Sequence, residues 1–185
     1  MVETAKYDVV LEDGEFEVRR YNKMLIASVS SPVGSQFNRL FQYISGNNKA
    51  KSKIDMTSPV ITSEKIEMTA PVFSSEESMS FVVPSKYDGD TVPEPTDPSV
   101  SISEVPERYV ATIRFRGFAW KEAVNKKTGR LFEWLSTEGI EHKGKPFLMQ
   151  YNPPFVPGFL RRNEVGVEIE YKRDEHYNRA LSSSP

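Results

Sequence analysis

Few side chains in this sequence could ligate a metal ion. The 185 residues contain no cysteine and two histidines, which excludes a disulfide framework and any zinc or iron–sulfur site built on thiolates. His142 stands in a glycine- and lysine-rich stretch, residues 139–145, that is typical of an exposed turn, and His176 stands in a charged tail. We therefore predict no metal site ligated by histidine. The other side chains that could reach a metal ion are Met56, Met68 and Tyr151.

Sequence motifs for catalysis are also missing. The chain has no glycine-rich loop that would hold a nucleotide, no Gly-x-Ser-x-Gly turn and no histidine–carboxylate cluster with metal-binding spacing. Carboxylates do occur close together, at Glu76-Glu77 and at Glu168 and Glu170. Carboxylates that alternate along a strand usually form its solvated face. The sequence therefore favours a binding protein over an enzyme.

Hydrophobic periodicity predicts the secondary-structure elements of the first half of the chain. Residues 16–29 combine β-branched and aromatic residues with turn residues near their middle, which predicts a pair of strands. The pattern then changes to Phe37, Leu40, Phe41 and Ile44, the spacing that places four side chains on one face of a helix. Such an apolar stripe usually packs on a sheet, so core packing is one interpretation of these residues.

The second half of the chain repeats these features. Residues 16–29 align with residues 100–113 with apolar and polar positions in phase, and Arg39–Ile44 aligns with Arg130–Leu135 with three identities. We therefore predict an α+β fold in which a β-α-β-β unit occurs twice about a pseudo-twofold axis. Its antiparallel sheet would be curved or closed, with the two helices outside. A groove between two related halves is a common place for a ligand.

Length and composition predict one domain, residues 1–185. The hydrophobic share of 38% is enough for a core without disulfide or metal staples. The internal halves would span about 7–83 and 100–171. The linker between them, 84–99, contains four prolines and cannot continue a helix or a central strand. The tail, 172–185, offers little to bury and is predicted to fray.

Charge and hydropathy argue against two classes of partner. The 24 basic and 26 acidic residues give a net charge of -2, and no basic run is long enough to follow a nucleic-acid backbone. No stretch of 18 consecutive apolar residues occurs, and the first residues lack the pattern of a secretory leader. We predict a cytoplasmic protein without a membrane span. Four short basic clusters are interpreted as solvated surface charge: Arg19-Arg20, Lys49 to Lys53, Lys126-Lys127 and Arg161-Arg162.

A shorter repeat within the first half carries a family resemblance. The motif Lys-Ile-acid-Met-Thr-small-Pro-Val occurs at residues 53–60 and again at residues 65–72. In structural terms it predicts two extended segments that each end at a proline. The doubled motif resembles the signature of the SOUL haem-binding family. Other stretches agree with this resemblance, in the same order along the chain: residues 16–21, 42–47, 151–155 and 161–165.

The resemblance implies a fold, a ligand and a site. The fold would be a distorted antiparallel β-barrel with two helices outside, also found in bacterial effector-binding domains. The ligand would be haem or a related planar tetrapyrrole, in an apolar groove between the first helix and the loop with two adjacent prolines. Carried over to this sequence, the site residues are Phe37, Leu40, Phe41, Pro153, Pro154, Phe155, Pro157 and Phe159.

This chain departs from the family pattern where iron and propionates are thought to bind. Arg20 stands at the position where some members carry a histidine proposed as an axial ligand, and an arginine offers iron no lone pair. Gly34, Gln42 and Val156 stand where other members carry basic residues. The prediction is therefore a tetrapyrrole held by apolar contact, without a histidine ligand to the metal.

Three functions outside catalysis stay open from the sequence. The first is a carrier or buffer of haem or a related tetrapyrrole. The second is an effector-binding or sensing domain for another flat hydrophobic small molecule, because the fold suits it and the iron-specific residues are absent. The third is a protein-interaction module, in which residues 161–164 would dock a partner, although the same residues could equally pin a turn by charged hydrogen bonds.

Overall fold

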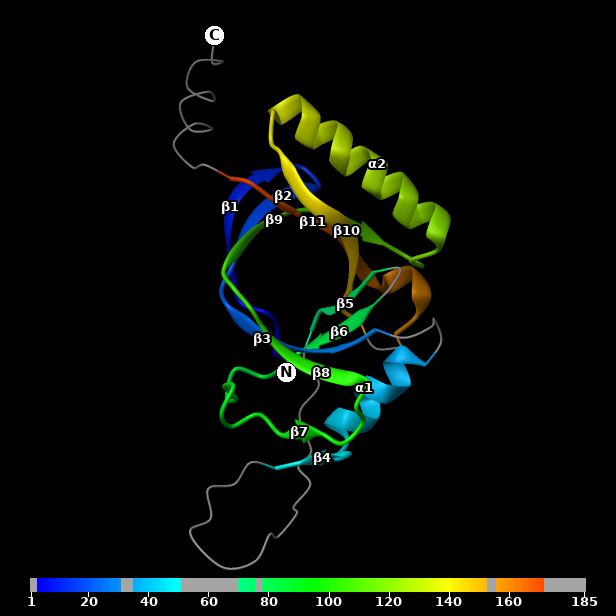
Figure 1. Cartoon of the computed structure of the whole chain (residues 1–185). Helices are drawn as coiled ribbons and strands as arrows, with labels where there is room; N and C mark the ends of the chain where they lie inside the picture. The colour runs from blue at the N-terminus through cyan, green and yellow to red at the C-terminus, as the bar shows by residue number, and fades with distance from the viewer. Residues whose placement is uncertain (1–2, 31–34, 51–69, 76–77, 153–155, 172–185) are drawn as a thin grey trace, which may run out of the picture.

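The computed structural model describes residues 3–30, 35–50, 70–75, 78–152 and 156–171. Figure 1 shows a strongly curved sheet with one helix along its upper side and a shorter helix below. In chain order the elements are β1 (Tyr7–Asp13), β2 (Phe16–Tyr21), β3 (Met24–Val29), α1 (Gln36–Ile44), β4 (Asn48–Lys49), β5 (Val72–Ser74), β6 (Met79–Val82), β7 (Glu94–Pro95), β8 (Val100–Val105), β9 (Arg108–Arg116), α2 (Lys121–Glu138), β10 (His142–Gln150), the 3-10 turn η1 (Gly158–Leu160) and β11 (Arg162–Ile169).

The main sheet is antiparallel and open. Its nine described strands follow the order β1-β2-β9-β11-β10-β5-β6-β3-β8, so β1 and β8 are its two edges. The α+β class, the large antiparallel sheet and the two helices are confirmed. The closed barrel implied by the resemblance is wrong for the described residues, because the edge strands β1 and β8 do not pair with each other.

Helix α2 covers the convex face of β2, β9 and β11. Side chains alternate along each strand, and one set of them packs with Leu131, Trp134 and Leu135 of α2. The strand residues of this core include Val18, Ala111, Ile113, Val165 and Val167. The buried residues of α2 all lie in its second half, so its first half stands farther from the sheet.

Helix α1 packs on the other end of the sheet. Leu40, Tyr43 and Ile44 form a second core with residues of β3 and β6, including Ala27 and Phe81. The predicted helix therefore begins one residue before Phe37 and ends at Ile44, as its hydrophobic spacing indicates. Neither helix in the described ranges has the length and hydrophobicity that crossing a bilayer requires.

Two segments predicted to be irregular contain strands in the structure. The stretch 139–145 is not simply a turn: Gly139 ends α2 in a left-handed conformation with φ of 65°, and β10 begins at His142. Within the predicted linker, β7 pairs with β4 through Asn48 and Pro95, which anchors the linker beside the end of α1. The doubled motif at 53–60 and 65–72 lies almost entirely outside the described residues.

Candidate ligand-binding surface

Helix α1 divides the predicted site residues between surface and core. Phe37 is 40% exposed and Phe41 is 45% exposed, and their rings stack with centroids 6.1 Å apart. Leu40, on the sheet side of the helix, has no exposed surface and lies in the core. The helix therefore presents two aromatic rings outward and uses the leucine between them as its anchor.

The loop before β11 presents a second apolar surface. Phe159, in η1, is 71% exposed, and Leu160 and Pro157 are exposed as well. Both ends of the loop are pinned: the Arg162 amide donates to Asn152 Oδ1 at 2.7 Å, and Arg161 Nε donates to the Val156 carbonyl at 2.9 Å. The other predicted residues of this loop, Pro153, Pro154 and Phe155, lie outside the described residues.

Polar side chains after this loop form hydrogen bonds with neighbouring backbone groups. Asn163 and Glu164 are buried, and Asn163 Nδ2 donates to the Gly117 carbonyl at 2.8 Å. Of the two interpretations of residues 161–164, these contacts match the one in which charged and polar hydrogen bonds pin a turn.

Sequence reasoning missed two exposed aromatic residues beside this loop. Phe118 and Trp120 connect β9 to α2, and both side chains are at least half exposed. Their rings stack with centroids 5.4 Å apart. The signal was present in the sequence, because two aromatic residues follow Gly117 outside the periodic pattern of either neighbouring element.

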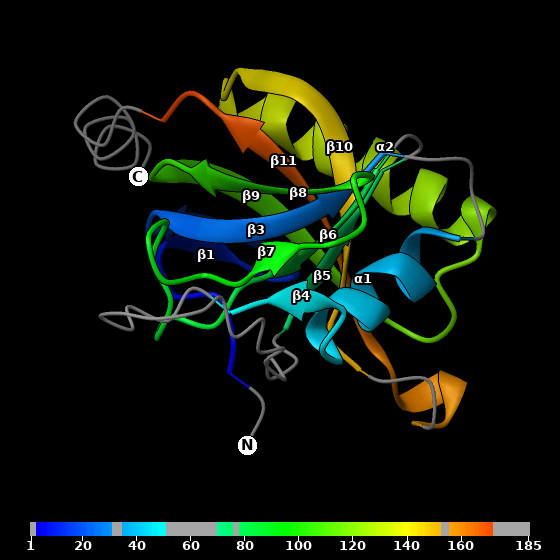
Figure 2. The same ribbon diagram turned by 60° about the horizontal axis from the view of Figure 1, so that its bottom comes forward.

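These three segments lie on the same side of the molecule. Figures 1 and 2 both place α1, the orange segment that contains η1 and the start of α2 at the right of the molecule. We call the exposed rings of Phe37, Phe41, Phe118, Trp120 and Phe159 the aromatic surface.

The aromatic surface offers faces for a flat ring but no imidazole. His142 is exposed, as predicted, and stacks on Phe132 with centroids 4.7 Å apart. Phe132 lies in the second half of α2, an 18-residue helix about 27 Å long whose first turn follows Trp120. His142 is therefore far from the aromatic surface. The described ranges hold no group of three or more histidine, aspartate or glutamate side chains able to bind a metal ion. His176 lies outside them.

The concave face of the sheet holds a buried ion pair that the sequence did not reveal. Arg19 of β2 and Glu164 of β11 have fully buried side chains. The pair is bidentate, with Arg19 Nη1 donating to Glu164 Oε2 at 2.5 Å and Arg19 Nη2 donating to Oε1 at 3.0 Å. The interpretation of Arg19-Arg20 as surface charge is therefore wrong for Arg19. It holds for Arg20, which pairs with Asp8 on the surface.

Further hydrogen bonds complete this buried network. Glu164 also accepts from Arg162 Nη2 at 2.6 Å and from the Tyr151 hydroxyl at 2.7 Å, while Arg19 Nε donates to Glu17 at 2.6 Å. Burial raises the pKa of Glu164, but hydrogen bonds from Arg19, Arg162 and Tyr151 outweigh burial and hold that pKa at about 2. Ionised Glu164 therefore stabilises the fold above its ordinary pKa of 4.5, and this stability is lost as pH falls toward about 2.

Tyr151 is committed to this network. Burial is the main cause that raises the pKa of the Tyr151 hydroxyl, and the hydroxyl donates its proton to Glu164. A tyrosine ligates haem iron as the phenolate, so this hydroxyl is not available for ligation. Met56 and Met68 lie outside the described residues.

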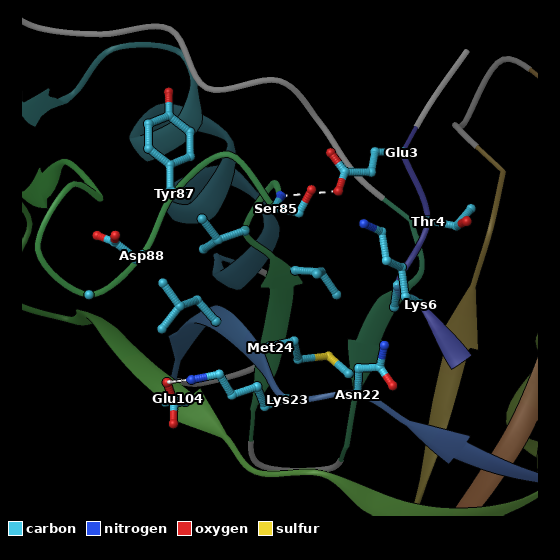
Figure 3. A pocket seen from close by; sticks show the side chains of 15 residues that line it. Glu3, Thr4, Lys6, Asn22, Lys23, Met24, Ser85, Tyr87, Asp88 and Glu104 are labelled. Atoms are coloured by element: carbon cyan, nitrogen blue, oxygen red, sulfur yellow. Dashed lines mark hydrogen bonds and ion pairs between the residues drawn. The ribbon is translucent and has the colours of Figure 1, made fainter. Parts of the chain in front are cut away.

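Two cavities lined by described residues lie away from the predicted site residues. The cavity in Figure 3 has a volume of about 300 Å³ and a rim of mixed charge, including Lys23, which is 3.5 Å from Glu104. Glu3, on the same rim, accepts a hydrogen bond from the Ser85 amide at 3.0 Å. The second cavity, of about 550 Å³, lies between the first half of α2 and β10, with Val124 and Leu148 in its wall.

Comparison with known proteins gives the fold's relatives and the chain's family. The fold is similar to that of the EcmrR C-terminal domain, with a TM-score of 0.53 at 13% identity over 90% of this chain and 99% of that one. The model of the SOUL heme-binding protein family matches residues 2–168. This chain therefore belongs to the SOUL heme-binding protein family.

Curated relatives agree with that assignment. Heme-binding protein 2 of Homo sapiens is 30% identical over 169 residues, which cover 87% of this chain and 81% of the relative. Heme-binding protein 1 of Xenopus laevis is 25% identical over 162 residues, which cover 86% of this chain and 84% of the relative.

Proposed function

We propose that this protein binds haem or a related planar tetrapyrrole on the exposed rings of α1 and η1 and acts as a carrier or buffer, not as an enzyme. The observation that carries the proposal is the set of exposed rings on α1 and η1, at positions where the family resemblance places the ligand. Names of the relatives support the ligand class. Phe37, Phe41, Pro157 and Phe159 would contact the ring, with Leu40 beneath them and Pro153, Pro154 and Phe155 completing the loop.

The binding energy would come from burying apolar surface. A porphyrin is flat, large and apolar on both faces, and each Å² of apolar area removed from water contributes roughly 25 cal/mol. Ring stacking adds about 0.5–1.5 kcal/mol for each aromatic pair. Since no imidazole of the described residues lies near these rings, the metal would contribute little to affinity.

Replacing both Phe37 and Phe41 by alanine should weaken porphyrin binding about tenfold, because two stacking contacts are lost. Titration with haemin, followed by the Soret band, measures this change. Val9→Ala is the control, because Val9 is an exposed apolar residue on β1, at the far edge of the sheet. The proposal fails if the double variant binds haemin as tightly as the Val9→Ala variant does.

A second candidate function is sensing of another flat hydrophobic molecule. The cavity of about 550 Å³ beside α2 favours it, because Val124, Phe147, Leu148 and Val165 give that cavity an apolar wall. A tight complex with a non-porphyrin aromatic compound that leaves haemin unbound would favour this function.

We also propose that the domain contains an internal duplication. Strand β2 pairs with β9, and β3 pairs with β8. The two strands of residues 16–29 thus each meet a strand of the aligned residues 100–113, which supports a pseudo-twofold axis. We propose one domain whose two related halves each contribute strands to both ends of the sheet.

A further inference from the structure

The connection between β9 and α2 is held rigidly beside η1. The Gly117 amide donates to the Arg161 carbonyl at 3.0 Å, and the Gly117 carbonyl accepts from Asn163. Gly117 itself has φ of 110°, a conformation that favours glycine. At the other end, the Val124 amide donates to the Trp120 carbonyl at 2.9 Å and starts α2. Phe118 and Trp120 therefore stand on a backbone that is fixed before any ligand arrives.

Close packing fixes the position of the Phe118 ring. The ring lies directly on Gly158, the first residue of η1, so closely that a Cβ atom at position 158 would overlap it. The absence of a side chain at Gly158 thus leaves room for the Phe118 ring to pack on the loop. The Phe118–Trp120 pair therefore lies against η1, the turn that carries the exposed Phe159.

Exposure makes this pair unusual. Trp120 is 67% exposed, although tryptophan gains more than most residues from burial. Exposed apolar patches of this kind commonly mark binding surfaces. Positive charge borders the pair, because Arg161 lies over the Phe118 ring at 6.0 Å and Lys121 follows Trp120. Aromatic faces bordered by cations suit a flat ring that carries carboxylates.

We propose that Phe118 and Trp120 form a second aromatic wall of the tetrapyrrole site, on the side of η1, and that the ligand's carboxylate edge lies toward Arg161 and Lys121. This inference rests on the proposed function and adds residues that neither the family motifs nor the relatives' names assign. It makes the β9–α2 connection part of the site.

The two tryptophans allow a direct test of where the ring binds. The chain labelled with 5-fluorotryptophan gives two fluorine resonances, one for exposed Trp120 and one for Trp134 of α2, which is buried against the sheet. The Trp120→Phe variant assigns them. Metal-free protoporphyrin should shift the Trp120 resonance by its ring current and leave that of Trp134 nearly unchanged. If the Soret band shows bound porphyrin but the Trp120 resonance does not move, the second aromatic wall is overturned and the proposed function is not.

Variants separate this wall from the proposed function as a whole. Phe118→Ala/Trp120→Ala should weaken protoporphyrin binding about tenfold. Gly158→Ala should also weaken it, because the new methyl group displaces the Phe118 ring. Gly129→Ala is the matched control, since nothing lies within 4 Å of a Cβ atom there. Wild-type affinity in both test variants overturns the second wall, whereas a wild-type chain that binds no porphyrin overturns the proposed function itself.

Discussion

Replacing Arg19 by methionine is expected to lower the free energy of unfolding by about 3–5 kcal/mol, because it leaves the buried carboxylate of Glu164 without its main partner. Methionine fills much of the volume of arginine, so the loss comes from the uncompensated charge and not from a cavity. Urea denaturation at neutral pH, followed by circular dichroism, measures the change.

The next residue supplies the matched control for that experiment. Arg20 lies on the opposite face of the same strand and pairs with Asp8 at 2.8 Å on the surface. Surface ion pairs contribute little to stability, so Arg20→Met should unfold at nearly the wild-type urea concentration. Equal losses from the two variants would mean that the Arg19–Glu164 pair does not hold the two strands together.

The second large effect is expected at Leu40. Leu40→Ala should lower the free energy of unfolding by about 2–5 kcal/mol, because it opens a cavity between α1 and the sheet. Phe41→Ala, one residue later, should change stability less, because Phe41 is already 45% exposed. Thermal or urea denaturation of both variants gives the comparison.

The effects of these two substitutions on porphyrin binding should have the opposite order to their effects on stability. At a temperature where both variants are folded, Phe41→Ala should weaken binding, while Leu40→Ala should bind almost like the wild type. The assignment of these neighbours to surface and core is contradicted if Phe41→Ala proves to be the more destabilised variant.

Most of the fold could be predicted because its signals are local. The spacing of Phe37, Leu40, Phe41 and Ile44 specifies α1 and, within it, the sheet-facing side. Strands β2 and β3 follow from β-branched and aromatic residues around a turn. The prediction that they pair with each other is wrong, because β2 pairs with β1 and β9 while β3 pairs with β6 and β8. Whether the sheet closes could not be predicted, because closure depends on the pairing of edge strands and on sheet curvature, which no short motif encodes.

The buried network could not be predicted for a similar reason. Arg19 and Arg20 are identical in type and adjacent in sequence, and only the alternation of β2 against a distant strand separates them. Glu164, the partner of Arg19, lies 145 residues away. A local pattern that looks like surface charge therefore carries no information about which arginine finds a buried carboxylate.

The candidate site was predicted in part. The helix residues and η1 follow from the family resemblance, and the structure places Phe37, Phe41 and Phe159 on the surface. Phe118 and Trp120 were missed because they belong to no periodic pattern and to none of the family stretches recognised in the sequence. The packing of Phe118 on Gly158 and the hydrogen bond from the Gly117 amide to the Arg161 carbonyl connect them to the loop, and both contacts depend on the tertiary fold.

The most direct test of the central claim compares haemin with metal-free protoporphyrin on the wild-type chain. If apolar contact with the flat ring supplies the affinity, the two dissociation constants from Soret titrations should agree within about threefold. Tight binding of haemin with no binding of the metal-free ring would show that ligation of iron carries the affinity, and it would contradict the account.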